Sequence, residues 1–243
     1  MQPRVIDSIA RTTEEFLYQV SSYIQNGQQP QIQPADVLLL HGWAQRNPTF
    51  HKLLPYLKDR NISFCAPNYP WKHDVDTIIE GTDTFPGIDA IVDQMQPPVS
   101  ILGYSYGGLI AKDYALQHPE KVEKLVLVAS PLDGTFAAEI PYKIGKALGI
   151  ADHNLGGLRD MYFDAVNAKY LINTQIPPHP ILTVLGRRDE LLWPHSTARI
   201  NRAEENRRIH EIFLPRGTHI DTIYHPTALE IIADFLKGDY PST

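Results

Sequence analysis

Apolar residues occur along this chain in two patterns. Some stand in short unbroken runs, and others recur every three or four residues. Unbroken runs are typical of strands in a parallel sheet, because both faces of such a strand are covered. We therefore predict strands at 37–40, 62–66, 99–102, 125–129 and 181–185, and a further strand at 209–214, where apolar and polar residues alternate.

The three- and four-residue spacing predicts amphipathic helices between these strands. It occurs at 50–57, 88–95, 109–117 and 229–236, and also at 4–25, before the first strand. Strands that alternate with helices indicate an α/β fold, with a mostly parallel central sheet and helices on both faces. We expect residues 1–34 to form an N-terminal helical extension and residues 35–243 to form the main domain.

The alternation lapses between about residues 132 and 180. This stretch carries several short helical patterns and five glycines, at 134, 145, 149, 156 and 157. We interpret it as a small cap-like insertion between two strands of the sheet. Ligands of open α/β sheets bind beyond the carboxyl ends of the strands, so the residues that follow each strand are the candidates for chemistry.

Charge and composition exclude several classes of function. The chain has 243 residues, which suits one domain, and its formal net charge of -6 argues against a nucleic-acid partner. Lys and Arg are scattered, and no apolar run reaches the ~18–20 residues that span a bilayer. The N-terminus lacks the unbroken apolar stretch of a signal peptide, so we expect a cytoplasmic protein.

The lone cysteine, Cys65, lies in a predicted strand. A single cysteine forms no internal disulfide, and a thiol in a strand is typical of a buried structural residue. The sequence also lacks the Cys-x-x-Cys and His-Glu-x-x-His spacings of common zinc sites. We expect neither a metal nor a cofactor.

Ser105 is the candidate nucleophile. It follows the 99–102 strand within Gly103-Tyr104-Ser105-Tyr106-Gly107-Gly108, and a predicted helix comes next. Gly-x-Ser-x-Gly between a strand and a helix is the motif of a nucleophile elbow, in which small residues let strand and helix approach closely. The alternative is a glycine-rich turn with a capping serine. The helix N-terminus would favour negative charge developing beside Ser105.

Two backbone N–H groups are candidates for an oxyanion hole. Tyr106, the residue after the nucleophile, would supply one. The other would come from the loop after the 37–40 strand, where His41 and Gly42 precede Trp43; we favour Trp43, with Ala44 as the alternative. His41 itself could be taken for a catalytic base, but we interpret it as a residue that braces this loop.

An acid and a base follow the last two strands. Asp189 comes after the 181–185 strand and is the candidate acid; Glu190 and Asp133 are its rivals, and a solvated turn is the alternative. His219 follows the 209–214 strand and is the candidate general base among ten histidines. The chain order Ser105, Asp189, His219 is the nucleophile–acid–base order of one large group of serine hydrolases.

With these residues identified, the sequence resembles the α/β-hydrolase superfamily, and within it small bacterial lipase-like esterases. The resemblance runs from about residue 35 to residue 236. It is carried by the strand and His-Gly-Trp at 37–43, the elbow at 103–108, a Ser-Pro-Leu-Asp-Gly-Thr segment at 130–135 similar to a lipase segment, and Gly-Thr-His at 217–219. Tyr104 and Tyr106 depart from the His and Met that are usual in lipase elbows, and Leu132-Asp133 departs from the lipase segment.

The resemblance implies an α/β-hydrolase fold and hydrolysis of carboxylic esters through an acyl-enzyme on Ser105. A small-molecule ester or a lipid would be the substrate. The same three residues would also serve an acyltransferase, a thioesterase or a hydrolase of carbon–carbon bonds. A binding module without catalysis is the alternative from another class, because fold does not fix function.

Overall fold

The computed structural model describes residues 33–162, 175–200 and 208–239. The helix expected at 4–25 lies outside these ranges, as does nearly all of the expected N-terminal extension.

In the described chain, six strands form one parallel sheet in the order β2-β1-β3-β4-β5-β6. The register is regular at the carboxyl ends of the central strands, where Leu40 pairs with Gly103 and Tyr104 pairs with Val128. The strands are β1 (Val37–Leu40), β2 (Phe64–Cys65), β3 (Val99–Tyr104), β4 (Val122–Val128), β5 (Ile181–Gly186) and β6 (Ile209–Leu214). The second strand is thus shorter than the predicted 62–66.

Successive residues of one strand bury their side chains on opposite faces of the sheet. In β1, Leu38 and Leu40 pack into one core cluster, and Val37 and Leu39 pack into the other. Both faces of the sheet are therefore buried, which explains why the central strands appear in the sequence as unbroken apolar runs.

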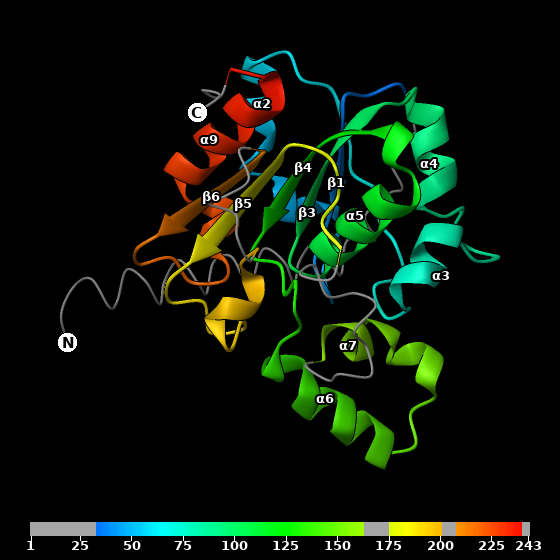
Figure 1. Ribbon diagram of the computed structural model, residues 1–243. Helices are drawn as coiled ribbons and strands as arrows, with labels where there is room; N and C mark the ends of the chain where they lie inside the picture. Colours follow the sequence, from blue (N-terminus) through cyan, green and yellow to red (C-terminus); the bar gives the residue numbers. More distant parts are fainter. Residues whose placement is uncertain (1–32, 163–174, 201–207, 240–243) are drawn as a thin grey trace.

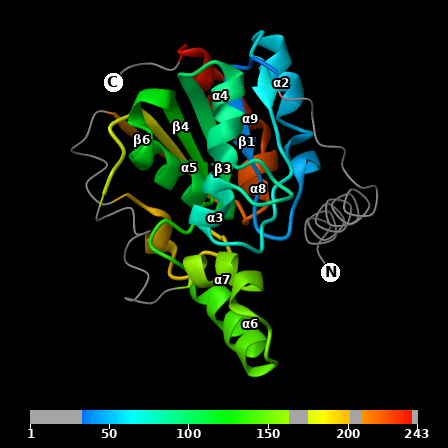
Figure 2. The same ribbon diagram turned by 90° about the vertical axis from the view of Figure 1, so that its right-hand side faces the viewer.

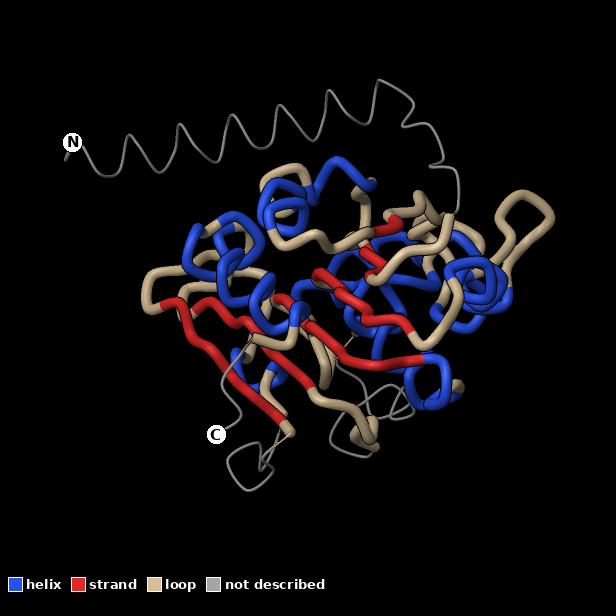
Figure 3. Tube along the Cα trace, turned by 90° about the horizontal axis from the view of Figure 1, so that it is seen from above, coloured by secondary structure: helices blue, strands red, loops and turns tan. Residues whose placement is uncertain are grey.

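Helices cover both faces of the sheet, as Figure 3 shows from above. On one face lie α3 (Val75–Glu80), α4 (Ile88–Met95) and α5 (Tyr106–Gln117), and on the other lie α2 (Leu54–Asp59), α8 (Asp221–Tyr224) and α9 (Pro226–Lys237). The short 3-10 helices are η1 (Asn47–Phe50), η2 (Pro119–Lys121), η3 (Asp152–Asn154) and η5 (His195–Ala198). The expected mostly parallel sheet with helices on both faces is confirmed.

Between β4 and β5 the chain leaves the two helical layers. It forms α6 (Phe136–Ala147), η3 and α7 (Gly156–Met161), which lie together at one end of the molecule (Figures 1 and 2). We refer to residues 136–161 as the cap segment. Its contacts with the sheet domain include the backbone hydrogen bond from Gly157 N–H to the carbonyl of Lys72 (3.2 Å) and the packing of α7 near α3.

Candidate active site

Ser105 lies on a strained turn between β3 and α5. Its backbone has φ 54° and ψ -121°, a conformation that L-residues rarely adopt and that is found where surrounding structure enforces it. A Cβ on Gly103 would lie 2.3 Å from the carbonyl oxygen of Gly107, and a Cβ on Gly108 would lie 1.8 Å from Oγ of Ser130. The glycines of the motif are therefore required by close contact, and α5 begins at Tyr106 instead of the predicted Leu109.

The loop after β1 lies directly beside this turn. A Cβ on Gly107 would meet the carbonyl oxygen of Leu40 at 2.1 Å, and a Cβ on Gly42 would lie 3.1 Å from Cβ of Ser105. The Gln45 side chain fixes the loop by accepting the Gly42 N–H at 3.0 Å. Elements that are distant in sequence thus meet around Ser105.

Both predicted oxyanion donors lie next to this turn. Tyr106 is the first residue of α5, and Trp43 follows Gly42 in the neighbouring loop. The Trp43 side chain lines the same cavity as Ser105, whereas the alternative donor, Ala44, is exposed.

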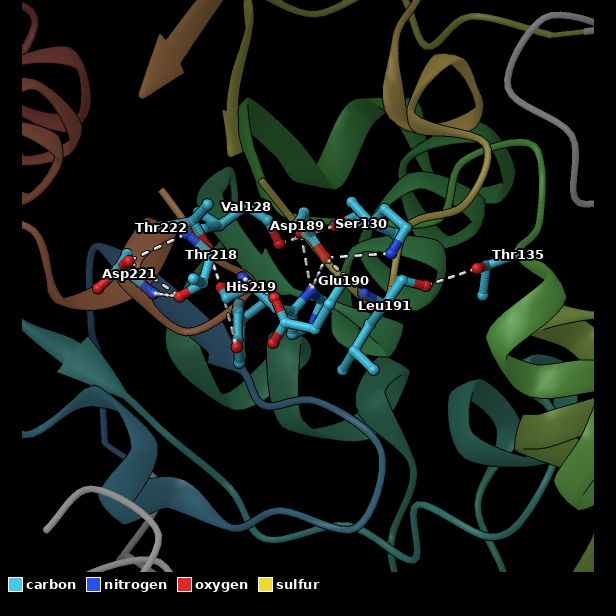
Figure 4. A network of polar contacts seen from close by, with 12 residues as sticks. Val128, Ser130, Thr135, Asp189, Glu190, Leu191, Thr218, His219, Asp221 and Thr222 are labelled. Carbon is cyan, nitrogen blue, oxygen red and sulfur yellow. Dashed lines mark hydrogen bonds and ion pairs between the residues drawn. The ribbon is translucent and has the colours of Figure 1, made fainter. Parts of the chain in front are cut away.

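Asp189 and His219 form a buried pair (Figure 4). Nδ1 of His219 lies 3.0 Å from Oδ1 and 2.9 Å from Oδ2 of Asp189. Oδ1 of Asp189 also accepts the backbone N–H groups of Leu191 and Leu192, each at 3.0 Å. An ionised carboxylate only accepts hydrogen bonds, so we assign the imidazole proton to Nδ1, which leaves Nε2 as an acceptor.

The rival acids and bases occupy other places. Glu190 accepts the backbone N–H of His219 at 3.3 Å, so it contacts the main chain instead of the imidazole. The Asp133 carboxylate acts electrostatically on buried Lys112. His118 is half-buried, with its ring centroid 4.7 Å from that of Tyr114, and the histidine at 225 is exposed.

The structure adds residues that the sequence analysis did not assign. Tyr104, at the end of β3, donates its hydroxyl to the carbonyl of His219 at 3.3 Å, and the two rings lie 5.3 Å apart. Thr222 donates to the same carbonyl at 2.5 Å, and Asp221 accepts the N–H of Thr218 at 3.0 Å (Figure 4). Together these contacts fix the loop that carries the histidine. The only sequence signal was the position of Tyr104 beside Ser105.

A cavity of about 270 Å³ joins the candidate residues. Ser105, His219, Trp43 and Gln45 line it from the sheet domain. The cap segment closes it with apolar side chains, among them Ala137, Ala138, Pro141, Leu158 and Met161. The cavity therefore places a serine hydroxyl and an imidazole in a pocket that is otherwise mostly apolar, as is typical of small-molecule sites.

His41 is fully buried and lies outside this cavity. Its ring stacks on Tyr69 with the centroids 4.0 Å apart, and Nδ1 lies 2.9 Å from the carbonyl oxygen of Gly42. The Tyr69 hydroxyl donates to the His41 carbonyl. Burial lowers the pKa of His41 to about 4, so the ring is neutral near pH 7 and braces the loop.

The one cysteine, Cys65, is buried. Burial raises the pKa of the Cys65 thiol to about 11, which disfavours the nucleophilic thiolate. Within ranges 33–162, 175–200 and 208–239, no three His, Cys, Asp or Glu side chains are grouped so that they could hold a metal ion. None of the helices described is both long enough and apolar enough to cross a membrane.

Comparison with known proteins agrees with this architecture. A family model described as the alpha/beta hydrolase fold matches residues 90–169. The monoacylglycerol lipase of Paleococcus ferrophilus superposes with a TM-score of 0.64 at 15% identity, over 85% of this chain and 96% of the lipase. The chain has the α/β-hydrolase fold. The meta-cleavage product hydrolase of Pseudomonas fluorescens shares it, with a TM-score of 0.59 at 17% identity over 85% and 91% of the two chains.

Sequence comparison finds curated relatives over part of this chain. The pimeloyl-[acyl-carrier protein] methyl ester esterase of Neisseria meningitidis serogroup C is 32% identical over 140 residues, which are 58% of this chain and 52% of the relative. The protein of the same name from Photobacterium profundum is 36% identical over 115 residues, or 46% and 42% of the two chains. The chain thus spans about half the length of the curated relatives it matches.

Proposed function

We propose that this α/β-hydrolase fold carries a serine esterase that cleaves carboxylic esters through an acyl-enzyme on Ser105. One observation supports this most directly. Ser105, on its strained turn, and His219, held by both oxygens of Asp189, line the same cavity. A nucleophile, a base and a group that orients the base are the parts that acyl transfer requires.

In the proposed reaction, Nε2 of His219 accepts the hydroxyl proton while Oγ of Ser105 attacks the ester carbonyl carbon. The backbone N–H groups of Trp43 and Tyr106 stabilise the oxyanion of the tetrahedral intermediate. His219 then protonates the departing alcohol, and the C–O bond of the ester breaks. Water, deprotonated by the same imidazole, attacks the acyl-enzyme and releases the carboxylic acid and the free serine.

The curated relatives indicate which esters to test first. They are named for the hydrolysis of a methyl ester, pimeloyl-[acyl-carrier protein] methyl ester. We therefore propose esters of aliphatic acids with small alcohols as the substrate class. The apolar walls that the cap segment contributes to the cavity fit the acyl part of such esters.

The test compares wild type with Ser105→Ala on p-nitrophenyl esters from acetate to palmitate. The variant should lose at least about 10⁴-fold in kcat/KM, because nucleophile and base act as a unit. Ser196→Ala is the matched control, since it removes a hydroxyl from an exposed position outside the cavity. Equal rates for wild type and Ser105→Ala would reject the mechanism.

Two further measurements separate the alternatives. A fluorophosphonate probe should label wild type and not Ser105→Ala, because labelling requires an activated serine; an unlabelled wild type would favour a binding module. Thioester substrates and added alcohols, assayed beside the esters, distinguish a thioesterase or an acyltransferase from an esterase with the same residues.

A further inference from the structure

The cap segment packs against both residues whose backbone N–H groups are proposed to hold the oxyanion. At Gly157, near the start of α7, a Cβ would lie 3.0 Å from Cδ1 of Trp43 and 3.1 Å from Cε1 of Tyr106. The same Cβ would lie 2.5 Å from the carbonyl oxygen of Trp71, so a glycine is required for α7 to approach this closely. One end of α7 therefore touches the side chains of both proposed donors.

The Tyr106 side chain links the nucleophile elbow to the cap segment. Its hydroxyl donates to the carbonyl oxygen of His73 at 2.8 Å and to Oδ2 of Asp160, in α7, at 3.3 Å. Tyr106 is fully buried, so these protein acceptors, and not bulk water, hold the hydroxyl. Because a buried side chain is confined to one rotamer, fixing its far end also constrains the backbone that carries it.

Asp160 is in turn held by the sheet domain. The N–H of Val75, the first residue of α3, donates to the same Oδ2 at 2.7 Å. Arg159 lies between two carboxylates, 3.2 Å from Asp74 and 3.5 Å from Oδ1 of Asp160. Burial raises the pKa of Asp160 to about 6, so at pH 8 its carboxylate is ionised and is a strong hydrogen-bond acceptor.

The position of Asp160 separates it from the substrate. Within the described chain, its neighbours Leu158 and Met161 line the cavity of Ser105, whereas Asp160 does not. Burying a carboxylate costs free energy, and an apolar side chain of similar size would pack the cap segment without that cost. The buried acid thus points to a requirement for directed hydrogen bonds at this place, and its link to the elbow is the Tyr106 hydroxyl.

We propose that Asp160 is a positioning residue: by holding the Tyr106 hydroxyl and the Val75 N–H on one carboxylate oxygen, it fixes the Tyr106 backbone N–H for the oxyanion. This inference rests on the proposed esterase function and extends it, because the cap segment then contributes to transition-state stabilisation as well as closing the cavity. An interaction that acts only in the transition state changes kcat and leaves KM nearly constant.

The first test removes the carboxylate and then restores an acceptor. At pH 8, Asp160→Ala should lower kcat for p-nitrophenyl butyrate at least about tenfold, because a displaced oxyanion donor stabilises the transition state poorly. KM should stay within about twofold of wild type. Asp160→Asn keeps an acceptor oxygen and should restore kcat to within about threefold of wild type.

Asp152→Ala is the matched control for Asp160→Ala. It also removes a carboxylate from the cap segment, but at an exposed position, where Asp152 pairs with Lys146. Its kcat should equal that of wild type. An unchanged kcat in Asp160→Ala, or a loss confined to KM, would overturn the inference.

A second variant tests the same link without changing Asp160. Tyr106→Phe keeps the ring and removes the hydroxyl, so it should also lower kcat at nearly constant KM. The double variant Tyr106→Phe/Asp160→Ala should lose no more than the larger of the two single losses, because both changes remove one hydrogen bond. Losses that multiply in the double variant would show that the two residues act independently and would overturn the inference.

A measurement without turnover keeps this inference separate from the proposed function. In protein labelled with ¹⁵N-tyrosine, the Tyr106 amide signal is identified as the one that Tyr106→Phe removes. Asp160→Ala should shift this signal by more than its linewidth, and Asp152→Ala should not. A wild type that hydrolyses no ester would reject the esterase alone, whereas an unmoved Tyr106 amide in Asp160→Ala would reject the positioning role even in an active esterase.

Discussion

Asp189 contacts His219 through both of its carboxylate oxygens, at 3.0 and 2.9 Å from the same imidazole nitrogen, Nδ1. The carboxylate is fully enclosed, and backbone N–H groups of Leu191 and Leu192 complete its hydrogen bonds. A buried charge with this many donors is held in one orientation. The tautomer and the direction of the imidazole are therefore set before any substrate binds.

Removing the negative charge of Asp189 should change the tautomer of the His219 imidazole. We expect Asp189→Asn to lower kcat about 10³- to 10⁴-fold, because the amide can donate to Nδ1 and so favour the tautomer whose Nε2 carries the proton. Steady-state kinetics on p-nitrophenyl butyrate measures the loss, and thermal unfolding confirms that the variant is folded.

Glu190→Gln is the matched control for that experiment. Glu190 neighbours Asp189 but accepts the backbone N–H of His219, so its amide should change kcat by only a few-fold. A large loss in Glu190→Gln beside only a small loss in Asp189→Asn would mean that the neighbouring carboxylate, and not Asp189, acts as the acid.

The elbow should not tolerate a methyl group at position 107. We expect Gly107→Ala to lower the free energy of unfolding by about 2 kcal/mol or more. Its Cβ would lie 2.1 Å from the Leu40 carbonyl oxygen, and the backbone of β1, which carries this oxygen, cannot easily move away. Gly149→Ala is the control: its Cβ would meet nothing within 4 Å, so the variant pays only about 1–2 kcal/mol for the positive φ of 74°. Urea unfolding at pH 7 tests both, and equal stability of wild type and Gly107→Ala would contradict the close contact.

The placement of Ser105, Asp189 and His219 at one end of the sheet could be predicted from the sequence for a simple reason. Each follows a strand with a recognisable pattern, and the carboxyl ends of parallel strands meet at the same edge. The start of α5 could not be predicted, because Tyr106 and the two glycines after it add no apolar period to the helix.

Contacts between distant parts of the chain could not be predicted from the sequence either. Asp160, in α7, accepts the Val75 N–H at 2.7 Å and the Tyr106 hydroxyl at 3.3 Å, across separations of 85 and 54 residues. Tyr104 reaches the His219 carbonyl across 115 residues. Local patterns encode periodicity and turns, whereas such pairs depend on how the cap segment and the last loop pack on the sheet.

His41 should make the protein sensitive to acid. Its pKa is about 4 in the folded chain, chiefly because burial disfavours the charged ring, and about 6.5 in the unfolded chain. The unfolded chain therefore binds the proton more tightly between these values, and stability should fall by about 3 kcal/mol in total as the pH drops from 6.5 to 4. Urea unfolding across this range should show a smaller drop for His41→Gln than for wild type; parallel curves would contradict the assignment.

Asp160 should act in the opposite direction over nearly the same range. Burial raises its pKa to about 6, despite the Val75 N–H, Arg159 and the Tyr106 hydroxyl, which favour the charged form; Asp74 adds to the rise. The folded chain then binds the proton more tightly than the unfolded chain, so the contribution of Asp160 to stability should decline by on the order of 3 kcal/mol as the pH rises from 4 to 6. Asp160→Asn keeps an acceptor for the Val75 N–H but cannot titrate. The unfolding free energy of wild type minus that of Asp160→Asn should therefore decrease with rising pH, and a difference that increases or stays constant would show that Asp160 is ionised throughout.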